Sequence, residues 1–216
     1  MIETLAQLRS LYAEPAERAL RKQRPALDVH CQRFIALSPF CVVASAGAVA
    51  AHGGPGVGLL DASPRGGAPG FAKTPDAHTL LLPDSGGNNR LDSLSNLLDD
   101  PRLGLLFFVP GFDETLRVNG TAQLRDEAHY TALFASDHFR PKLVIEVRVQ
   151  EAYLHCAKAM MRSRLWSEEA RVARNVMPTL NQIIHAQMGL TAQPESQESM
   201  VARYGAMIAA EQIKKN

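Results

Sequence analysis

The sequence predicts an α+β protein in which an antiparallel β barrel or sandwich carries helices packed on its outside. Helical periodicity marks both ends of the chain, over residues 1–37 and 151–216, and short apolar or alternating runs fill residues 38–150 between them. These strand-like runs do not alternate with helices, which argues against a doubly wound parallel sheet. At 216 residues, 46% of them hydrophobic, the chain is long enough for one domain made of these three parts.

Three helices are predicted in the N-terminal part. Leu5, Leu8 and Leu11 recur at three-residue spacing, and a second helix can begin at Pro15. Asp28 is a suitable N-cap for a third helix, because its carboxylate can accept hydrogen bonds from the free amides of the first turn.

Roughly six short strands and one helix are predicted in the middle part. The strand segments are 40–46, short pieces within the Gly- and Pro-rich stretch 47–70, and then 79–82, 103–109, 115–124 and 143–149. Leu91, Leu94 and Leu97 are spaced for a helix over 89–99, which Pro101 ends. The last third of the chain predicts helices over about 151–173 and 177–188 and an amphipathic helix over 200–213.

Charge and cysteine usage exclude several functional classes. Lys and Arg number 23 against 22 Asp and Glu, so the net charge of +1 gives no electrostatic case for binding nucleic acid or a membrane surface. The three cysteines, Cys31, Cys41 and Cys156, are scattered and form no CxxC pair, as expected in a reducing compartment. With no apolar run of about 18 residues and no leader pattern, we expect a soluble cytoplasmic protein.

Common catalytic motifs are absent from the sequence. It contains no Walker loop, HExxH or Gly-x-Ser-x-Gly pattern, and its seven histidines form no HxxxH pair. A metal site built by the protein is therefore not predicted.

Two segments could bind an anion. In the first, 61–70, small and flexible residues flank Arg65, so an anion could approach its guanidinium closely; the alternative is a surface hairpin with a solvated arginine. In the second, 83–93, a polar loop enters a helix N-terminus beside Arg90 and Ser93. Free amides, the helix dipole and a guanidinium converge there, which suits a phosphate.

The alternative for the second segment is ordinary helix capping. Asn88 and Asn89 directly precede the predicted helix, and either side chain could accept hydrogen bonds from its first amides.

Two further segments carry polar residues in a regular pattern. Thr115 and Arg117 fall on one face of a predicted strand, whose alternative interpretation is a half-exposed strand with a polar outer face. Lys158 and Arg162 are four residues apart on a predicted helix, and Trp166 follows; the alternative is a basic helix face with a tryptophan in the core.

Taken together, these segments resemble the pyridoxamine 5′-phosphate oxidase-like FMN-binding split-barrel family. The resemblance covers about residues 1–188 and depends on the order and spacing of several segments. The strongest are 100–108 (DPRLGLLFF) and 115–122 (TLRVNGTA), supported by 34–40, 63–66, 87–93 and 155–159.

The resemblance implies a six-stranded antiparallel split barrel and a homodimer with one FMN in each of two clefts at the subunit interface. Arg65 and Arg90 would clamp the FMN phosphate. Ser93 and the amides of Asn88 and Asn89 would add hydrogen bonds. The residues expected near the ring are Thr115 at the pyrimidine edge, Arg117 near N1–C2=O, and Lys158, Arg162, Ser163 and Trp166 reaching across the interface.

The sequence also departs from the family pattern. Gly67 stands where related sequences often carry Asp, and the oxidases' C-terminal arginine-and-histidine substrate signature has no counterpart. We therefore expect an FMN-dependent oxidoreductase with an unknown small-molecule substrate, and identify no catalytic acid or base. The alternatives are a non-enzymatic flavin- or haem-binding protein, with His155 or His185 as a haem ligand, and a structural or partner-binding domain.

Overall fold

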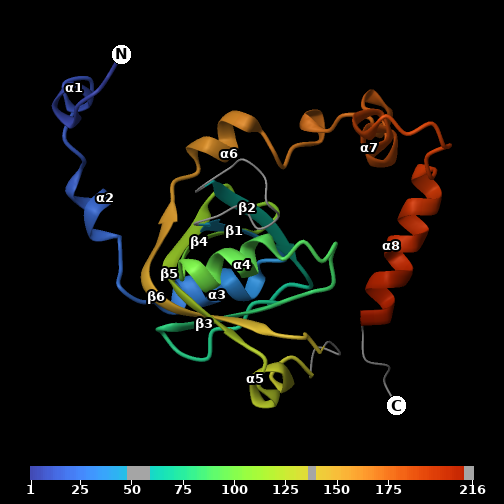
Figure 1. Ribbon diagram of the computed structural model, residues 1–216. Coiled ribbons are helices and arrows are strands. Elements are labelled where there is room, and N and C mark those ends of the chain that lie inside the picture. The colour runs from blue at the N-terminus through green and yellow to red at the C-terminus, as the bar shows by residue number, and fades with distance from the viewer. Residues whose placement is uncertain (48–58, 136–139, 212–216) are drawn as a thin grey trace.

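The chain folds around a six-stranded antiparallel sheet that curls into a half-barrel (Figure 1). The computed structural model describes residues 1–47, 59–135 and 140–211. The strands are β1 (Phe40–Ala46), β2 (Leu60–Gly66), β3 (Thr79–Pro83), β4 (Arg102–Phe108), β5 (Thr115–Arg125) and β6 (Val144–His155). Their order across the sheet is β2-β1-β4-β5-β6-β3, and all neighbours are antiparallel. The predicted α+β split-barrel class is confirmed.

The hydrophobic core lies on the inner face of the sheet. Alternating residues of each strand point inward, as Cys41 and Val43 of β1 and Leu116 and Val118 of β5 illustrate. Two helices complete this core: α3 (Val29–Leu37), which Asp28 caps as predicted by accepting a hydrogen bond from the Cys31 amide, and α4 (Asp92–Asp99).

The outer face of β2, β1 and β4 is also apolar, and the described residues leave much of it exposed. Leu60 is 84% exposed, and the rings of Phe40 and Phe108 lie 5.9 Å apart on this face. The outer face of a lone antiparallel sheet normally alternates to polar residues. The apolar side chains of this outer face are therefore exposed in the single chain.

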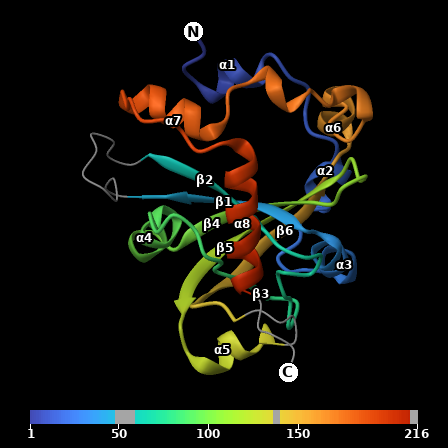
Figure 2. The same ribbon diagram turned by 90° about the vertical axis from the view of Figure 1, so that its right-hand side faces the viewer.

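Two terminal arms extend away from the barrel (Figures 1 and 2). The N-terminal arm, residues 1–26, carries α1 (Leu5–Arg9) and α2 (Glu17–Arg21). The C-terminal arm, residues 157–211, carries α6 (Lys158–Ser163), α7 (Leu180–Met188), α8 (Gln197–Glu211) and single 3-10 turns at Glu168–Ala170 and Arg174–Val176. Helices α1, α2 and α7 bury no residue, and α8 buries Met200 alone among its described residues.

The exposed area of the chain reflects these arms. Its accessible surface is 14723 Å², whereas a compact monomer of this mass has roughly 9,800 Å². Within the described part of the chain, no helix has both the length and the hydrophobicity needed to cross a bilayer.

The structure differs from the predicted elements in two places. The helix expected from residue 151 is instead the end of β6, because β5 pairs with β6 as far as His155. The backbone of Arg24 also pairs with Ala152 there, through two hydrogen bonds of 3.0 and 2.8 Å. A short helix, α5 (Ala128–Ala132), was not predicted. Part of the Gly-rich stretch, residues 48–58, and the end of the predicted last helix, residues 212–213, lie outside the described residues.

Candidate functional site

Side chains of β2 and of the start of α4 meet at one corner of the inner face. Residues two apart on a strand share a face, so Asp61, Ser63 and Arg65 lie in one row. Ser93 is almost fully buried, and its hydroxyl donates to Asp61 Oδ2 at 2.8 Å and lies 2.9 Å from Ser63 Oγ. We call these four residues together with Arg90 the β2–α4 corner.

Arg65 has a guanidinium nitrogen without a partner. Its Nη1 donates to the carbonyl of Pro64 at 2.9 Å, but its Nε is buried and has no hydrogen-bond partner among the described residues. The charge of Arg65 also acts on the carboxyl group of Asp84. Burial raises the pKa of Asp84, and the charges of Arg65 and Lys142 partly oppose that shift. A buried N–H without an acceptor costs about 1–3 kcal/mol, so an anion that reached Arg65 Nε would relieve this cost.

The first turn of α4 has no side-chain cap. Leu91 occupies the N-cap position with a left-handed backbone (φ 60°), and no side chain accepts from the helix amides. Asn88 Oδ1 accepts instead from the Arg90 backbone N–H at 3.1 Å, while Asn89 also has a left-handed backbone. The predicted alternative, capping by Asn88 or Asn89, was therefore wrong, because no side chain caps the start of α4.

Arg90 lies at the solvent side of the corner. Its Nε donates to Asp92 Oδ2 at 2.8 Å, and its side chain is 63% exposed. The hydrogen bond to Asp92 raises the pKa of Arg90, and the charge of Asp61 adds to that shift. Arg90 is thus within electrostatic reach of Asp61 in the β2–α4 corner.

A second polar group lies on the outer face of β5 and β6. Arg117 Nη1 donates to the Tyr153 hydroxyl at 2.9 Å, and the guanidinium lies 5.5 Å from the Tyr153 ring centroid. Thr115 is buried at the start of β5, directly opposite His155 in the strand register.

The register places these two groups on opposite faces of the sheet. Arg117 pairs with Leu106, Leu106 with Val42, and Val42 with Pro64. Directly paired residues share a face, so Arg117 shares a face with Pro64 and not with Arg65. Within one chain, the sheet separates Arg65 and Ser93 from Thr115 and Arg117.

The predicted residues of α6 are at the surface. Lys158, Arg162 and Ser163 are exposed, and the Ser163 hydroxyl donates to the carbonyl of Met160 at 3.0 Å. Trp166 Nε1 donates to the Phe112 carbonyl at 2.8 Å. This hydrogen bond connects the segment that follows α6 to the turn between β4 and β5 of the same chain.

Residues 27–156 match the family model of pyridoxamine 5′-phosphate oxidase, which is more than half of the chain. The chain belongs to this family. No curated protein matches it. The family match includes the β2–α4 corner, Thr115 and Arg117, and ends just before Lys158.

Several solved structures are similar to the chain. HupZ from Group A Streptococcus is 15% identical with a TM-score of 0.46, over 59% of this chain and 93% of HupZ. General Stress Protein 26 from Bacillus anthracis is 11% identical with a TM-score of 0.39, over 58% of this chain and 94% of that one. An FAD binding protein from Mycobacterium smegmatis is 10% identical with a TM-score of 0.41, over 61% of this chain and 97% of that one.

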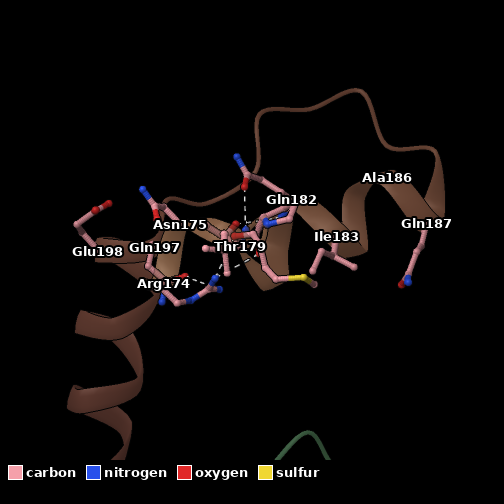
Figure 3. Close-up of a pocket in the computed structure, with 12 residues that line it drawn as sticks. Arg174, Asn175, Thr179, Gln182, Ile183, Ala186, Gln187, Gln197 and Glu198 are labelled. Atoms are coloured by element: carbon pink, nitrogen blue, oxygen red, sulfur yellow. Dashed lines mark hydrogen bonds between the residues drawn. The ribbon is translucent and has the colours of Figure 1, made fainter. Parts of the chain in front are cut away.

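An open cavity of about 910 Å³ lies in the C-terminal arm, outside the residues that match the family (Figure 3). Arg174 lies at its edge and donates to the carbonyls of Met177 and Pro178 and to Gln197 Oε1. The cavity contains none of the predicted site residues.

The two histidines considered as haem ligands differ in setting. His155 Nε2 is buried without a partner among the described residues, whereas His185 Nδ1 lies 3.0 Å from the Ala192 carbonyl in the C-terminal arm. Burial lowers the pKa of His155, and the charges of Arg117 and Lys22 lower it further.

Sequence reasoning did not single out Asp61, Ser63, Tyr153 or Lys22. The alternation of Asp61, Ser63 and Arg65 was visible in the sequence and could have identified the first two as neighbours of Arg65 on one strand face. Lys22 had no such signal, because its position depends on the pairing of Arg24 with β6.

Proposed function

We propose that this member of the pyridoxamine 5′-phosphate oxidase family is an FMN-binding flavoprotein, an FMN-dependent oxidoreductase that acts on a small molecule as a homodimer. One observation carries the proposal: the uncapped start of α4 lies beside β2, whose Arg65 has a buried nitrogen without a partner. That pair of features suits a phosphate monoester.

The β2–α4 corner fits the phosphate end of FMN. Arg65 Nε and the first amides of α4 supply donors, and the positive end of the helix dipole favours a dianion. Arg90 supplies a second guanidinium at the solvent side. The carboxylate of Asp61 would repel the phosphate, and it accepts hydrogen bonds from the hydroxyls of Ser63 and Ser93. Because hydroxyls rotate freely, each can donate to a phosphate instead.

Thr115 and Arg117 suit the ring end of the cofactor. The Thr115 hydroxyl can hydrogen-bond to the pyrimidine edge, and Arg117 would stabilise negative charge at N1–C2=O. When bound, FMN supplies hydride transfer at its N5. The protein then holds the ring, excludes water and adjusts the charge at its edge.

Two observations support a homodimer with the flavin at the interface. First, the excess accessible surface is roughly 4,900 Å² above that of a compact monomer, more than a standard interface buries on each partner. Second, the residues proposed for the phosphate (the β2–α4 corner) and those proposed for the ring (Thr115 and Arg117) lie on opposite faces of the sheet in one chain. A second copy docked on the β2 edge could offer its own Thr115 and Arg117 to an FMN held by the first. Lys158, Arg162, Ser163 and Trp166 are proposed to complete that interface.

An absorbance spectrum of the purified protein tests the function, with the ligand released by heat and identified by mass spectrometry. We expect the two flavin bands, in the near-ultraviolet and in the blue, and released FMN, and addition of a reductant should bleach the blue band. A Soret band would favour the haem alternative through His155. A colourless protein that also fails to bind added FMN would contradict the proposal.

A further inference from the structure

Three side chains surround Tyr153 on the outer face of β5 and β6. The Arg117 guanidinium and the Lys22 Nζ lie 5.5 and 5.3 Å from the centroid of its ring, and the His155 ring lies 4.9 Å away. We call Lys22, Arg117, Tyr153 and His155 the Tyr153 cluster. It lies on the face of the sheet opposite the β2–α4 corner.

Lys22 is held in this cluster by the backbone. The two hydrogen bonds between Arg24 and Ala152 attach the end of the N-terminal arm to β6. Lys22 Nζ also donates to the Leu154 carbonyl at 2.7 Å. These contacts keep its ammonium beside Tyr153, where an ordinary surface lysine would sample many positions.

The cluster offers hydrogen-bond donors whose cations are not paired with a carboxylate in the described part of the chain. Lys22 and Arg117 form no ion pair among the described residues, and His155 Nε2 is buried without a partner there. The Tyr153 hydroxyl accepts from Arg117, and its own O–H has no acceptor in the described part of the chain. Two cations held on one ring without an anion repel each other.

The neighbouring carboxylate forms no ion pair with either cation among the described residues. Glu151 lies on the same face of β6, but it accepts from the side-chain amides of Asn119 and Gln23. Burial lowers the pKa of His155, and the charges of Arg117 and Lys22 add to that shift. A hydrogen bond from the Lys158 backbone lowers the pKa of Cys156, just past the end of β6, and the charges of Lys158 and Lys22 add to it.

We propose that the Tyr153 cluster binds the anionic group, a carboxylate or a phosphate, of the small molecule that the flavin oxidises or reduces. An anion would give Lys22 and Arg117 their counter-charge and would accept from Tyr153 and His155. The inference rests on the proposed function, since Thr115 and Arg117, which border the cluster, are the residues proposed at the flavin ring.

Calorimetric titration of the FMN-loaded protein at low ionic strength tests this site, with inorganic phosphate and oxalate as probes. FMN fills the β2–α4 corner in this preparation, so that corner cannot bind the probe. Lys22→Gln should weaken binding of the preferred probe about tenfold or more, because a hydrogen bond to a charged group is lost. The control Arg21→Gln removes the same charge one residue away, from a side chain paired with Glu17, and should bind like the wild type.

A second readout links the site to the flavin. Probe binding should shift the flavin absorbance bands in the wild type and in Arg21→Gln, and His155→Phe should weaken the probe as Lys22→Gln does. Preference for phosphate or for oxalate identifies which anion the substrate carries. Equal affinity of Lys22→Gln and the wild type, or no binding of either probe, would overturn the proposal.

The two proposals can fail separately. If the protein does not bind FMN, the same titration without FMN still reports the cluster through the difference between Lys22→Gln and the wild type. Weaker probe binding by Lys22→Gln than by the wild type would then show that the cluster binds an anion, but would refute its assignment to the substrate of a flavin. Loss of that difference would refute the site itself.

Discussion

The barrel buries its apolar side chains, whereas the terminal arms leave many of theirs exposed. In the barrel, Phe107, Leu116 and Val118 are completely buried. In the C-terminal arm, Leu180 of α7 is 46% exposed and Met188 is 65% exposed. Both regions have well-formed elements, and α7 even has a complete capping box at Thr179.

The difference shows which parts of the molecule one chain can complete. The barrel, which matches the family model, closes its core with its own α3 and α4. The arms lie outside that match, and most of their apolar side chains stay exposed in the single chain. In the homodimer proposed above, a second copy would cover the arms and the apolar outer face of the barrel.

The largest expected effect separates the two regions by stability. Phe107→Ala should lower the free energy of unfolding by about 3–5 kcal/mol, because it opens a cavity in a closed core. Met188→Ala in the arm should change the unfolding of the barrel by less than about 0.5 kcal/mol. Urea denaturation at a protein concentration low enough to favour monomers measures both. Equal losses would mean that the arm packs on its own barrel.

The next effect places cofactor binding in the barrel. Arg65→Ala should weaken FMN binding by about 2–4 kcal/mol, since a charge-assisted contact to a desolvated phosphate is lost. Arg90→Ala should act in the same direction but less, because Arg90 is exposed and paired with Asp92. Flavin fluorescence titration measures both. Arg171→Ala, which removes an exposed cation of the arm, is the control, and unchanged FMN affinity in Arg65→Ala would remove that residue from the site.

A smaller effect tests what covers the arms. Leu180→Asp should weaken the dimer about tenfold or more, since a charge is buried in an apolar contact. Aspartate in the first turn of a helix is favourable, so α7 itself should persist. Gln187→Glu adds the same charge to a polar position of α7 and should leave the dimer intact. Light scattering after size-exclusion chromatography measures this, and a Leu180→Asp variant as dimeric as the wild type would refute the assignment.

The smallest effect is a dependence of stability on pH at the junction of barrel and arm. The pKa of His155 is lowered from its usual 6.5 by burial and by Arg117 and Lys22. The unfolded chain therefore binds a proton first as pH falls, and stability should decrease below about pH 6.5 until the folded pKa is reached. Melting temperatures between about pH 5 and 7.5 measure the slope, which His155→Gln should reduce. A slope that His155→Gln leaves unchanged would show that other groups cause it.

The sequence predicted the inner strands of the sheet better than its edge strand β2. Alternation in β5 and in β6 identified both strands, because each has one buried face. Around β2 only short strand pieces joined by hairpin turns were expected, since most residues from Asp61 to Gly66 are small or turn-forming. Its place at the sheet edge explains the difference, because Pro64 needs no hydrogen-bond partner on the free side of an edge strand.

The candidate site was predicted in pieces but not in its arrangement. Arg65 and Ser93 come from segments about 30 residues apart, and the contact between Ser63 and Ser93 brings those segments together. The position of Arg117 on the opposite face follows from strand order, which the sequence does not specify. Exposed apolar faces in the arms could not be told from core faces either, because periodicity shows a face and not what covers it.

Mixed dimers test most directly whether a second copy joins the two faces of the sheet into one flavin site. Chains carrying Arg65→Ala and chains carrying Arg117→Ala, with different tags, are co-expressed, and the mixed dimer is isolated and titrated with FMN. If one chain supplies Arg65 and the other Arg117, each mixed dimer has one intact site and one doubly impaired site. The account predicts one FMN bound per mixed dimer with wild-type affinity. Two equally weakened sites would contradict it, because each chain would then build its site alone.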